Sequence, residues 1–363
     1  MQNTYSIYDL SSEDLIELCK TWGEPEYRAA QIWKGLYQQL WSSLDNFTTL
    51  PKGLKQKLRE YFAENKTPDS EKLSFSKLSP IRIQKSTDGE TLKTLFALTE
   101  GKLVEAVLMR YYNRRSLCIS TQAGCAMGCV FCATGQMGFQ RQLSSGEIVE
   151  QVLYYARHLA LENKQVTNIV VMGMGEPFHN YDATMAAIRR LNDPQGFNLG
   201  ARRFTISTVG LVPGIRRFTQ AHSQINLAIS LHAADDTLRS HLLPINGKFP
   251  LDDLFSACLE YVQLTHRRLS FEWALIQGVN DTPEQASLLI QRLKLFRVKG
   301  SILCHVNVIP LNPTKMYEGQ SSTHQSALSF QKLLEQAGIP CTIRIRRGIE
   351  IQAGCGQLAG EFV

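Results

Sequence analysis

From residue 117 onward the sequence alternates between short apolar runs and amphipathic stretches, and this alternation is the feature that most restricts the fold. An amphipathic stretch after the first run begins at Ser144, which can form a capping box with Glu147. Strands that alternate with helices pair in parallel through right-handed crossovers. Six such units fall short of the eight of a closed barrel, so we expect an α/β fold with an incomplete (βα)6 barrel. The predicted strands are residues 117–122, 167–172, 203–209, 225–231, 269–276 and 302–308.

The segments on either side of this barrel have different periodicities. Apolar residues between Ala29 and Leu40 recur at helical spacing, which predicts a helix with one buried face. Alternating apolar residues on both sides of Glu100-Gly101 predict a β-hairpin. The expected division is a small helical domain at 1–90, a hairpin and linker at 91–116, the barrel at 117–346 and a tail at 347–363.

The composition is that of a globular protein in a reducing compartment. The 363 residues are 44% hydrophobic and 20% charged. No run approaches the ~18 apolar residues of a membrane span, and the first residues do not resemble a signal peptide. Nine cysteines, three of them close together, are unlike a disulfide framework. We therefore expect a cytoplasmic monomer without membrane contact, whose net charge of +6 permits nucleic-acid binding without demonstrating it.

The loop after the first predicted strand carries Cys125, Cys129 and Cys132 with the spacing C-x3-C-x2-C. Thiolates are soft ligands that suit an iron–sulfur cluster. Three protein ligands for four irons would leave one iron open to a small molecule, as in a catalytic cluster. A zinc site is the alternative, but structural zinc has four ligands, and the nearest histidine, His158, falls on a predicted helix. The spacing therefore favours a [4Fe–4S] cluster.

Polar residues also follow other predicted strands of the barrel. Chemistry in α/β barrels takes place at the C-terminal ends of the strands. Glu176, which follows Gly173-Met174-Gly175, could accept a hydrogen bond from an ammonium group. Each such residue alone is an ordinary turn residue, and only their occurrence together beside the cysteine loop indicates a binding site. The other polar strand ends carry Ser207, Ser230-Leu231-His232 and Asn312.

Two cysteines and one glutamate lie outside the pattern expected of core residues. Cys355 has glycine on both sides, which leaves its thiol uncovered, and upstream Arg346 and Arg347 could lower its pKa. Cys118 lies just inside the first predicted strand. Glu105 falls on an otherwise apolar strand face, although a register that exposes it to solvent would be the ordinary explanation. The cysteines in apolar periodic stretches, predicted to be core residues, are Cys19, Cys258, Cys304 and Cys341.

Together these motifs resemble the RlmN/Cfr family of radical S-adenosylmethionine (SAM) RNA methyltransferases, over nearly the whole chain. The cysteine loop alone is typical of the radical SAM superfamily. Its combination with Gly-Met-Gly-Glu-Pro, Ser-Leu-His, the segment 305–313 and a Cys-Gly-Gln-Leu tail is specific to the family. The resemblance implies that Cys125, Cys129 and Cys132 bind a [4Fe–4S] cluster, and that Cys355 carries a methyl group, Cys118 resolves the adduct and Glu105 is the general base. The SAM-binding residues that it implies are Gly175, Glu176, Ser207, Ser230, Leu231, His232 and Asn312.

The resemblance also implies a reaction and its partners. An RlmN-type enzyme methylates C2 of one adenosine in 23S rRNA, with the adenosine beside the tRNA anticodon as a further substrate and an external electron donor. Glu176-Pro177 and the segment 310–313 favour this branch over Cfr-type methylation at C8, while Glu350 and Gly354 are mild departures from the common pattern. A non-methylating radical SAM enzyme and a zinc-stabilised RNA-binding protein remain alternatives. The arginines expected to contact RNA are Arg110, Arg114, Arg115, Arg141, Arg344, Arg346 and Arg347.

Overall fold

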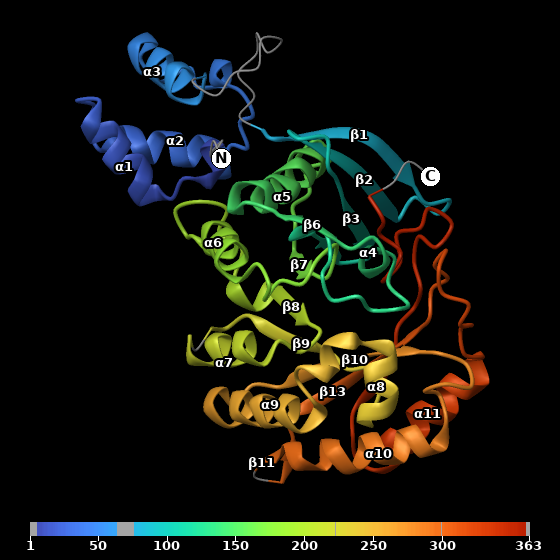
Figure 1. Cartoon of the computed structure of the whole chain (residues 1–363). Coiled ribbons are helices and arrows are strands. Elements are labelled where there is room, and N and C mark those ends of the chain that lie inside the picture. The colour runs from blue at the N-terminus through green and yellow to red at the C-terminus, as the bar shows by residue number, and fades with distance from the viewer. Residues whose placement is uncertain (1–5, 64–75, 222, 299, 361–363) are drawn as a thin grey trace.

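The computed structural model describes residues 6–63, 76–221, 223–298 and 300–360, and its main element is one ten-stranded sheet (Figure 1). The strand order is β1-β2-β3-β4-β7-β8-β9-β10-β13-β14, so β1 and β14 are the two edges. From β4 to β14 every neighbouring pair of strands is parallel. The parallel strands are β4 (Arg114–Cys118), β7 (Asn168–Val171), β8 (Phe204–Thr208), β9 (Asn226–Ser230), β10 (Leu269–Leu275), β13 (Cys304–Pro310) and β14 (Cys341–Ile343).

Helices cover the outer face of these parallel strands (Figure 1). One long helix follows each strand from β4 to β13, as a parallel sheet requires. The predicted incomplete (βα)6 barrel is therefore confirmed, with β14 as a further parallel strand. The outer helices are α5 (Ser145–Ala160), α6 (Tyr181–Asn192), α7 (Val212–Gln220), α9 (Leu251–Thr265), α10 (Pro283–Leu293) and α11 (His324–Gln336).

Three antiparallel strands extend the sheet beyond β4. The predicted hairpin is confirmed as β2 (Thr91–Leu98) and β3 (Leu103–Tyr111), and β3 pairs with β4, so the hairpin continues the barrel sheet. The prediction of helices up to residue 90 is wrong for β1 (Leu78–Lys85), which pairs with β2. Pro80 and the mostly exposed side chains hide this strand in the sequence, and both are tolerated because β1 is an edge strand with an irregularity after Pro80.

The N-terminal helices α1 (Ser12–Thr21) and α2 (Tyr27–Tyr37) lie on the side of α5 and α6, and α3 (Lys52–Ala63) lies farther from the barrel (Figure 1). The apolar face predicted for α2 is buried, from Ala29 to Tyr37. Two arginines of the barrel helices hold this region through its backbone. Arg157 donates to Leu40 O at 2.9 Å and Arg190 to Leu10 O at 3.0 Å. These hydrogen bonds hold the chain before α1 and after α2 against the barrel helices α5 and α6. The predicted boundary near residue 90 stays a prediction, and residues 1–5, 64–75 and 361–363 lie outside the described part.

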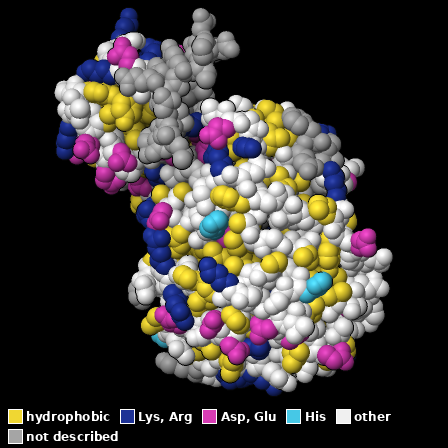
Figure 2. All heavy atoms as spheres, in the orientation of Figure 1, with side chains coloured by type: hydrophobic (Ala, Val, Ile, Leu, Met, Phe, Trp, Pro, Cys, Tyr) yellow, Lys and Arg dark blue, Asp and Glu magenta, His cyan; other side chains and the backbone are white. Residues whose placement is uncertain are grey.

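Side chains of both charges share the face of the molecule that Figure 2 shows, where Lys and Arg are spread together with Asp and Glu. Within the described residues, the helices are too short or too polar to cross a membrane.

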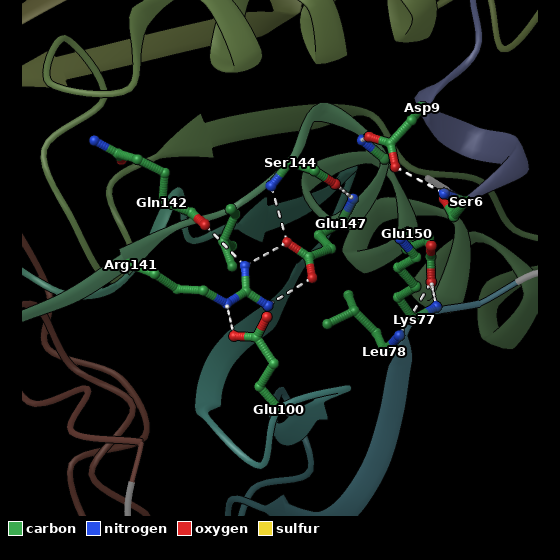
Figure 3. Close-up of polar contacts among 12 residues, drawn as sticks. Ser6, Asp9, Lys77, Leu78, Glu100, Arg141, Gln142, Ser144, Glu147 and Glu150 are labelled. Carbon is green, nitrogen blue, oxygen red and sulfur yellow. Dashed lines mark hydrogen bonds and ion pairs between the residues drawn. The ribbon is translucent and has the colours of Figure 1, made fainter. Parts of the chain in front are cut away.

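The predicted capping box at the start of α5 is confirmed (Figure 3). Ser144 N donates to Glu147 Oε2 at 2.8 Å, and Glu147 N donates to Ser144 Oγ at 3.2 Å. Arg141 adds an ion pair to Glu147, with Nη2 at 2.7 Å from Oε1, and a second to Glu100. This network anchors the chain between the cysteine loop and α5.

Candidate active site

One cavity of about 1030 Å³ runs through the barrel, from the C-terminal strand ends to residues that precede β8 and β10. It is lined by the cysteine loop, by polar strand ends and by part of the C-terminal tail. Every predicted site residue lines this cavity except Leu231 and Glu105. The fold therefore brings together residues that are far apart in the sequence.

The backbone of the cysteine loop is fixed by its own hydrogen bonds. Short strands β5 (Gln122–Gly124) and β6 (Phe139–Gln142) pair on either side of it. Gly124 has φ +70°, and a Cβ there would lie 1.9 Å from the carbonyl oxygen of Gly138, so only glycine fits. Val130 N donates to Leu242 O at 3.1 Å, which ties the loop to the barrel. Contacts within the protein therefore hold the backbone of this loop.

The three thiols of the loop suit a cluster with a separate iron for each ligand. Burial raises the pKa of Cys125 to about 12 and that of Cys129 well above its usual range, and neighbouring cysteines contribute to both shifts. Iron binding must therefore displace protons from the thiols. Nowhere in the described ranges do three candidate ligands lie close enough to share a single metal ion. Cys125, Cys129 and Cys132 nevertheless face the same cavity, as ligands to different corners of a cubane cluster would.

The glycine turn after β7 holds Glu176 against the sheet. Gly175 has φ +98°, and a Cβ on it would meet Gln122 at 2.5 Å, so this glycine is required by packing. Glu176 Oε1 accepts from Phe178 N at 2.9 Å and Oε2 from Val209 N at 2.8 Å. Burial raises the pKa of Glu176 to about 7. Each carboxylate oxygen still has a free lone pair for a ligand ammonium group.

The ends of β8 and β9 place two hydroxyls and one imidazole on the cavity wall. Ser207 and Ser230 lie side by side, with their Oγ atoms 3.2 Å apart. His232 has φ +61°, and its Nδ1 accepts from Ala274 N at 2.9 Å, which assigns the proton to Nε2. Burial and the nearby Arg239 lower the pKa of His232 to about 3. His232 is therefore a neutral hydrogen-bonding group at physiological pH.

Asn312 carries a polar atom that the described residues leave without a partner. Its side chain is buried, and Nδ2 donates to the backbone oxygen of Cys355 at 3.0 Å. Its Oδ1 is buried without a hydrogen-bond partner among the described residues. A buried acceptor on a cavity wall is costly unless a ligand donor satisfies it. Asn312, Glu176 and the paired serines therefore fit a ligand with amino and hydroxyl groups, as SAM has.

Cys355 and Cys118 line the cavity, and both are free thiols. Cys355 is exposed to the cavity, but the enclosing walls raise its pKa to about 11, and Glu272 contributes to that shift. The prediction that Arg346 and Arg347 lower this pKa is wrong, because desolvation dominates and Arg344 supplies the opposing charge. Burial also raises the pKa of Cys118 to about 12, with Cys355 as the next cause. The Cys355 thiol therefore contributes to the electrostatic environment of Cys118.

The structure places Glu105 behind the tail, away from the cavity wall. Its side chain is 2% exposed and forms an ion pair with Lys93. Its Oε2 accepts from Ala359 N at 2.8 Å and from Gly360 N at 3.1 Å. The ordinary expectation of solvent exposure for this glutamate is therefore wrong. Any contact between Glu105 and a substrate requires the tail to move.

Leu231 is buried and acts through its backbone, whose carbonyl accepts from Arg239 Nε at 3.2 Å. Sequence reasoning missed Arg239, a fully buried arginine that also donates to Val209 O at 2.7 Å. It also missed Glu272, a buried carboxylate on the cavity wall that accepts from Asn307 Nδ2 at 2.8 Å. In the sequence, Glu272 could have been found as a single charged residue within an otherwise largely apolar strand. The cysteines predicted to be core residues, Cys19, Cys258, Cys304 and Cys341, are all buried.

Comparisons with known proteins agree with this geometry. Residues 119–289 match the model of the radical SAM superfamily, and residues 5–63 match the N-terminal domain of a ribosomal RNA large subunit methyltransferase. A probable dual-specificity RNA methyltransferase RlmN of Chloroflexus aurantiacus is 48% identical over 98% of this chain and 93% of its own length. The dual-specificity RNA methyltransferase RlmN 1 of Myxococcus xanthus is 45% identical over 97% of this chain and 94% of its own.

A solved structure shares the fold over its full length. The radical SAM methyltransferase from Sphaerobacter thermophilus superposes with a TM-score of 0.91 at 45% identity, covering 98% of this chain and 99% of that one. The fold, the three-cysteine loop and the full-length similarity lead to one family. The chain belongs to the RlmN family of radical SAM RNA methyltransferases, whose cofactors are a [4Fe–4S] cluster and SAM.

Proposed function

We propose that this enzyme methylates C2 of a specific adenosine in 23S rRNA and, as a second substrate, the adenosine beside the tRNA anticodon. The observation that carries the proposal is that two free thiols, Cys118 and Cys355, line the same cavity as the cysteine loop. A non-methylating radical SAM enzyme has no need of this pair. The dual-specificity names of the relatives and the Glu176-Pro177 sequence favour this branch over Cfr-type methylation at C8.

The proposed cofactor contacts follow from the cavity wall. Cys125, Cys129 and Cys132 would bind the cluster. Glu176 would accept from the SAM ammonium group, while Gly175 and Leu231 shape the turns that frame the site. The remaining proposed SAM contacts are Ser207, Ser230, His232 and Asn312. When bound, the cluster and SAM supply a radical and a methyl group for a ring carbon that has no nucleophilic character.

Three side chains of the protein would handle the methyl group and the proton. Cys355 would receive a methyl group on its sulfur and present it to the base. Cys118 thiolate would then attack that sulfur, forming an S–S bond as the S–C bond to the product breaks. The product carbon would keep the electron pair of that bond and take up a proton to become the methyl group. Glu105 would accept the ring proton once the tail has left its carboxylate. The adenine must leave its stack to enter the cavity, as in other base-modifying enzymes.

The structure divides the predicted RNA-contacting arginines into two groups. Arg110 is engaged in a bidentate ion pair with Glu162, Arg141 binds Glu147 and Glu100, and Arg115 donates to Gln165 O. Arg115 does not line the cavity, whereas the others do and form no ion pair among the described residues. Their partners include only neutral groups: Arg346 donates to Leu311 O, Arg347 donates to Arg110 O, and Arg114 and Arg347 lie over the Tyr111 ring. We propose that this second group contacts RNA phosphates: Arg114, Arg344, Arg346 and Arg347.

The double variant Arg346→Ala/Arg347→Ala should bind RNA more weakly and with a smaller salt dependence. Loss of two phosphate contacts should reduce the slope of log K against log salt by about 1 to 2. Arg110→Ala is the matched control, because it removes the same kind of charge from a residue committed to Glu162. Fluorescence anisotropy with an rRNA fragment across a salt series measures the affinity and its salt dependence. Equal slopes for the double variant and for Arg110→Ala would contradict the division of the arginines into two groups.

Mass spectrometry of the modified nucleosides tests the reaction. The anaerobically purified enzyme is incubated with SAM, a low-potential reductant and either a 23S rRNA fragment or tRNA. We expect methyl at adenine C2 in both RNAs. Methyl at C8 would show the Cfr-type activity, and cleavage of SAM without RNA methylation would show a different radical SAM enzyme. We also propose that the protein acts as a cytoplasmic monomer and takes electrons from an external donor.

A further inference from the structure

A buried ion pair lies beneath the tail that carries Cys355. Lys93 on β2 and Glu105 on β3 place Nζ and Oε1 2.8 Å apart, and their side chains are 3% and 2% exposed. The next residue, Thr94, points to the opposite face of the sheet, where its hydroxyl meets the Tyr155 hydroxyl of α5. The sheet is therefore covered by α5 on one face and by the C-terminal tail on the other (Figure 1).

The ion pair binds the tail on both sides of Cys355. Lys93 Nζ donates to the backbone oxygen of Gln352 at 3.3 Å. Beyond Cys355, the backbone N–H groups of Ala359 and Gly360 donate to Glu105 Oε2 at 2.8 and 3.1 Å. The middle of the same loop is held from the cluster side, where Ala133 N donates to Gly356 O at 2.7 Å. The loop that carries the Cys355 thiol is thus held by the Lys93–Glu105 pair on one side and by Ala133 on the other.

The physical chemistry of the pair couples it to the tail. Two opposite charges removed from water are stable only when their remaining donors and acceptors are also satisfied. Here the tail backbone supplies partners for both charged groups. If the tail left, Glu105 would lose two donors and Lys93 one acceptor. By linkage, the free energy by which the docked tail stabilises the pair equals the free energy by which the pair stabilises the docked tail.

We propose that the Lys93–Glu105 pair positions the 352–360 loop so that the Cys355 thiol is held over the cavity for methyl transfer. The inference rests on the proposed role of Cys355 as methyl carrier. It gives Glu105 a task in the resting enzyme that precedes any role as a base. Lys93, which has no assigned role, becomes a positioning residue for the reaction.

Three variants distinguish the role of the Lys93–Glu105 ion pair from the role of the Glu105 carboxylate alone. Glu105→Gln places an amide donor against the Lys93 ammonium group and leaves that charge buried without compensation. Lys93→Met removes the bond to Gln352 and leaves the Glu105 carboxylate to the two tail N–H groups. The double variant is neutral, and the amide oxygen introduced at position 105 can still accept from Ala359 and Gly360. We therefore expect the double variant to behave better than Glu105→Gln alone.

Hydrogen exchange of the 349–360 peptide in the cluster-loaded enzyme reports the docking of the tail. Glu105→Gln should accelerate this exchange by about a hundredfold and Lys93→Met by about tenfold. Single-turnover transfer of a labelled methyl group from SAM to Cys355, followed by mass spectrometry of the protein, should slow by a similar factor. SAM affinity should change less than methyl transfer does, because neither residue lines the cavity and the proposed contacts Glu176, Ser207 and Ser230 lie at strand ends outside the tail.

Glu147→Gln is the control, because it neutralises another buried carboxylate, whose ion pair to the partly exposed Arg141 lies at the start of α5, away from the tail (Figure 3). It should leave exchange of the tail unchanged. If tail exchange and methyl transfer to Cys355 are unchanged in both Glu105→Gln and Lys93→Met, the inference is wrong. If Glu105→Gln in addition stalls only after the methyl group has reached the RNA, Glu105 acts as a base and does not position the tail. If the wild-type Cys355 accepts no methyl group, the proposed function fails, while the exchange data still decide the anchoring.

Discussion

Cys118→Ala is expected to accumulate a covalent complex between the protein and its RNA substrate. In the proposed reaction the base becomes bonded through its new carbon to the sulfur of Cys355. Release needs a second thiol to attack that sulfur, and Cys118 is the free thiol that shares the cavity and interacts electrostatically with Cys355. Without it the S–C bond has no thiolate to break it, so turnover should fall by about three orders of magnitude. The trapped species would appear on a denaturing gel as a slowly migrating band.

Cys355→Ala is the informative counterpart, because it removes the other sulfur of the pair. This variant should show neither the covalent species nor methyl on the protein, and RNA methylation should be lost. Combining the two substitutions should reproduce Cys355→Ala, since the adduct must form before it can be resolved. Free turnover by Cys118→Ala, or full methylation by Cys355→Ala, would refute the two-cysteine reaction.

The wild-type release step should also depend on pH. Burial raises the pKa of the Cys118 thiol to about 12, so the attacking thiolate is a minor species near neutrality. Below that pKa the thiolate fraction rises ~tenfold per pH unit, and release should accelerate with it. A release rate that is flat with pH, measured by rapid quench after the adduct has formed, would mean that another step limits product release.

The sequence predicted the parallel strands and the strand-end residues because both depend on local patterns. Buried strands carry continuous apolar runs, and the C-terminal ends of neighbouring parallel strands meet at one edge. Ser207 and Ser230 illustrate this, since each is an unremarkable serine until β8 and β9 pair. The edge strand β1 was missed because an edge strand needs no apolar run and tolerates Pro80.

The features that escaped prediction depend on contacts between distant segments. Lys93 alternates with apolar residues in its strand and would normally point to solvent, yet the tail covers it. Arg239 lies on the short helix α8 (Asp236–Leu242), and only the fold shows that it binds the carbonyls at the ends of β8 and β9. The pKa of Cys355 was expected to fall because of nearby arginines, but enclosure by the cavity outweighs them. In each case, burial by segments distant in the sequence determines the environment of the side chain.

Replacing Cys129 with alanine is expected to remove the cluster while leaving the fold intact. The iron content should fall from about four per chain to near zero, because two thiolates do not retain a cubane cluster. The fold should survive, since the loop backbone is held by β5–β6 pairing and by Val130 N to Leu242 O. SAM cleavage and RNA methylation should therefore fall below detection with little change in the thermal midpoint of the apoprotein. Iron and sulfide analysis, visible absorption and circular dichroism on one anaerobic preparation measure all of these.

Cys19→Ala is the matched control, because Cys19 is an equally free cysteine buried in α1, outside the cavity. It should retain the full iron content and activity and lose only the packing of one sulfur atom. The same outcome for Cys125→Ala and Cys132→Ala as for Cys129→Ala would assign all three ligands, since each holds a different iron. Protein that is reconstituted with iron and sulfide but takes up only zinc would refute the cluster. Retention of iron by Cys129→Ala would mean that another residue serves as the third ligand, and the charge on Glu176 beside the loop makes that carboxylate the first to replace.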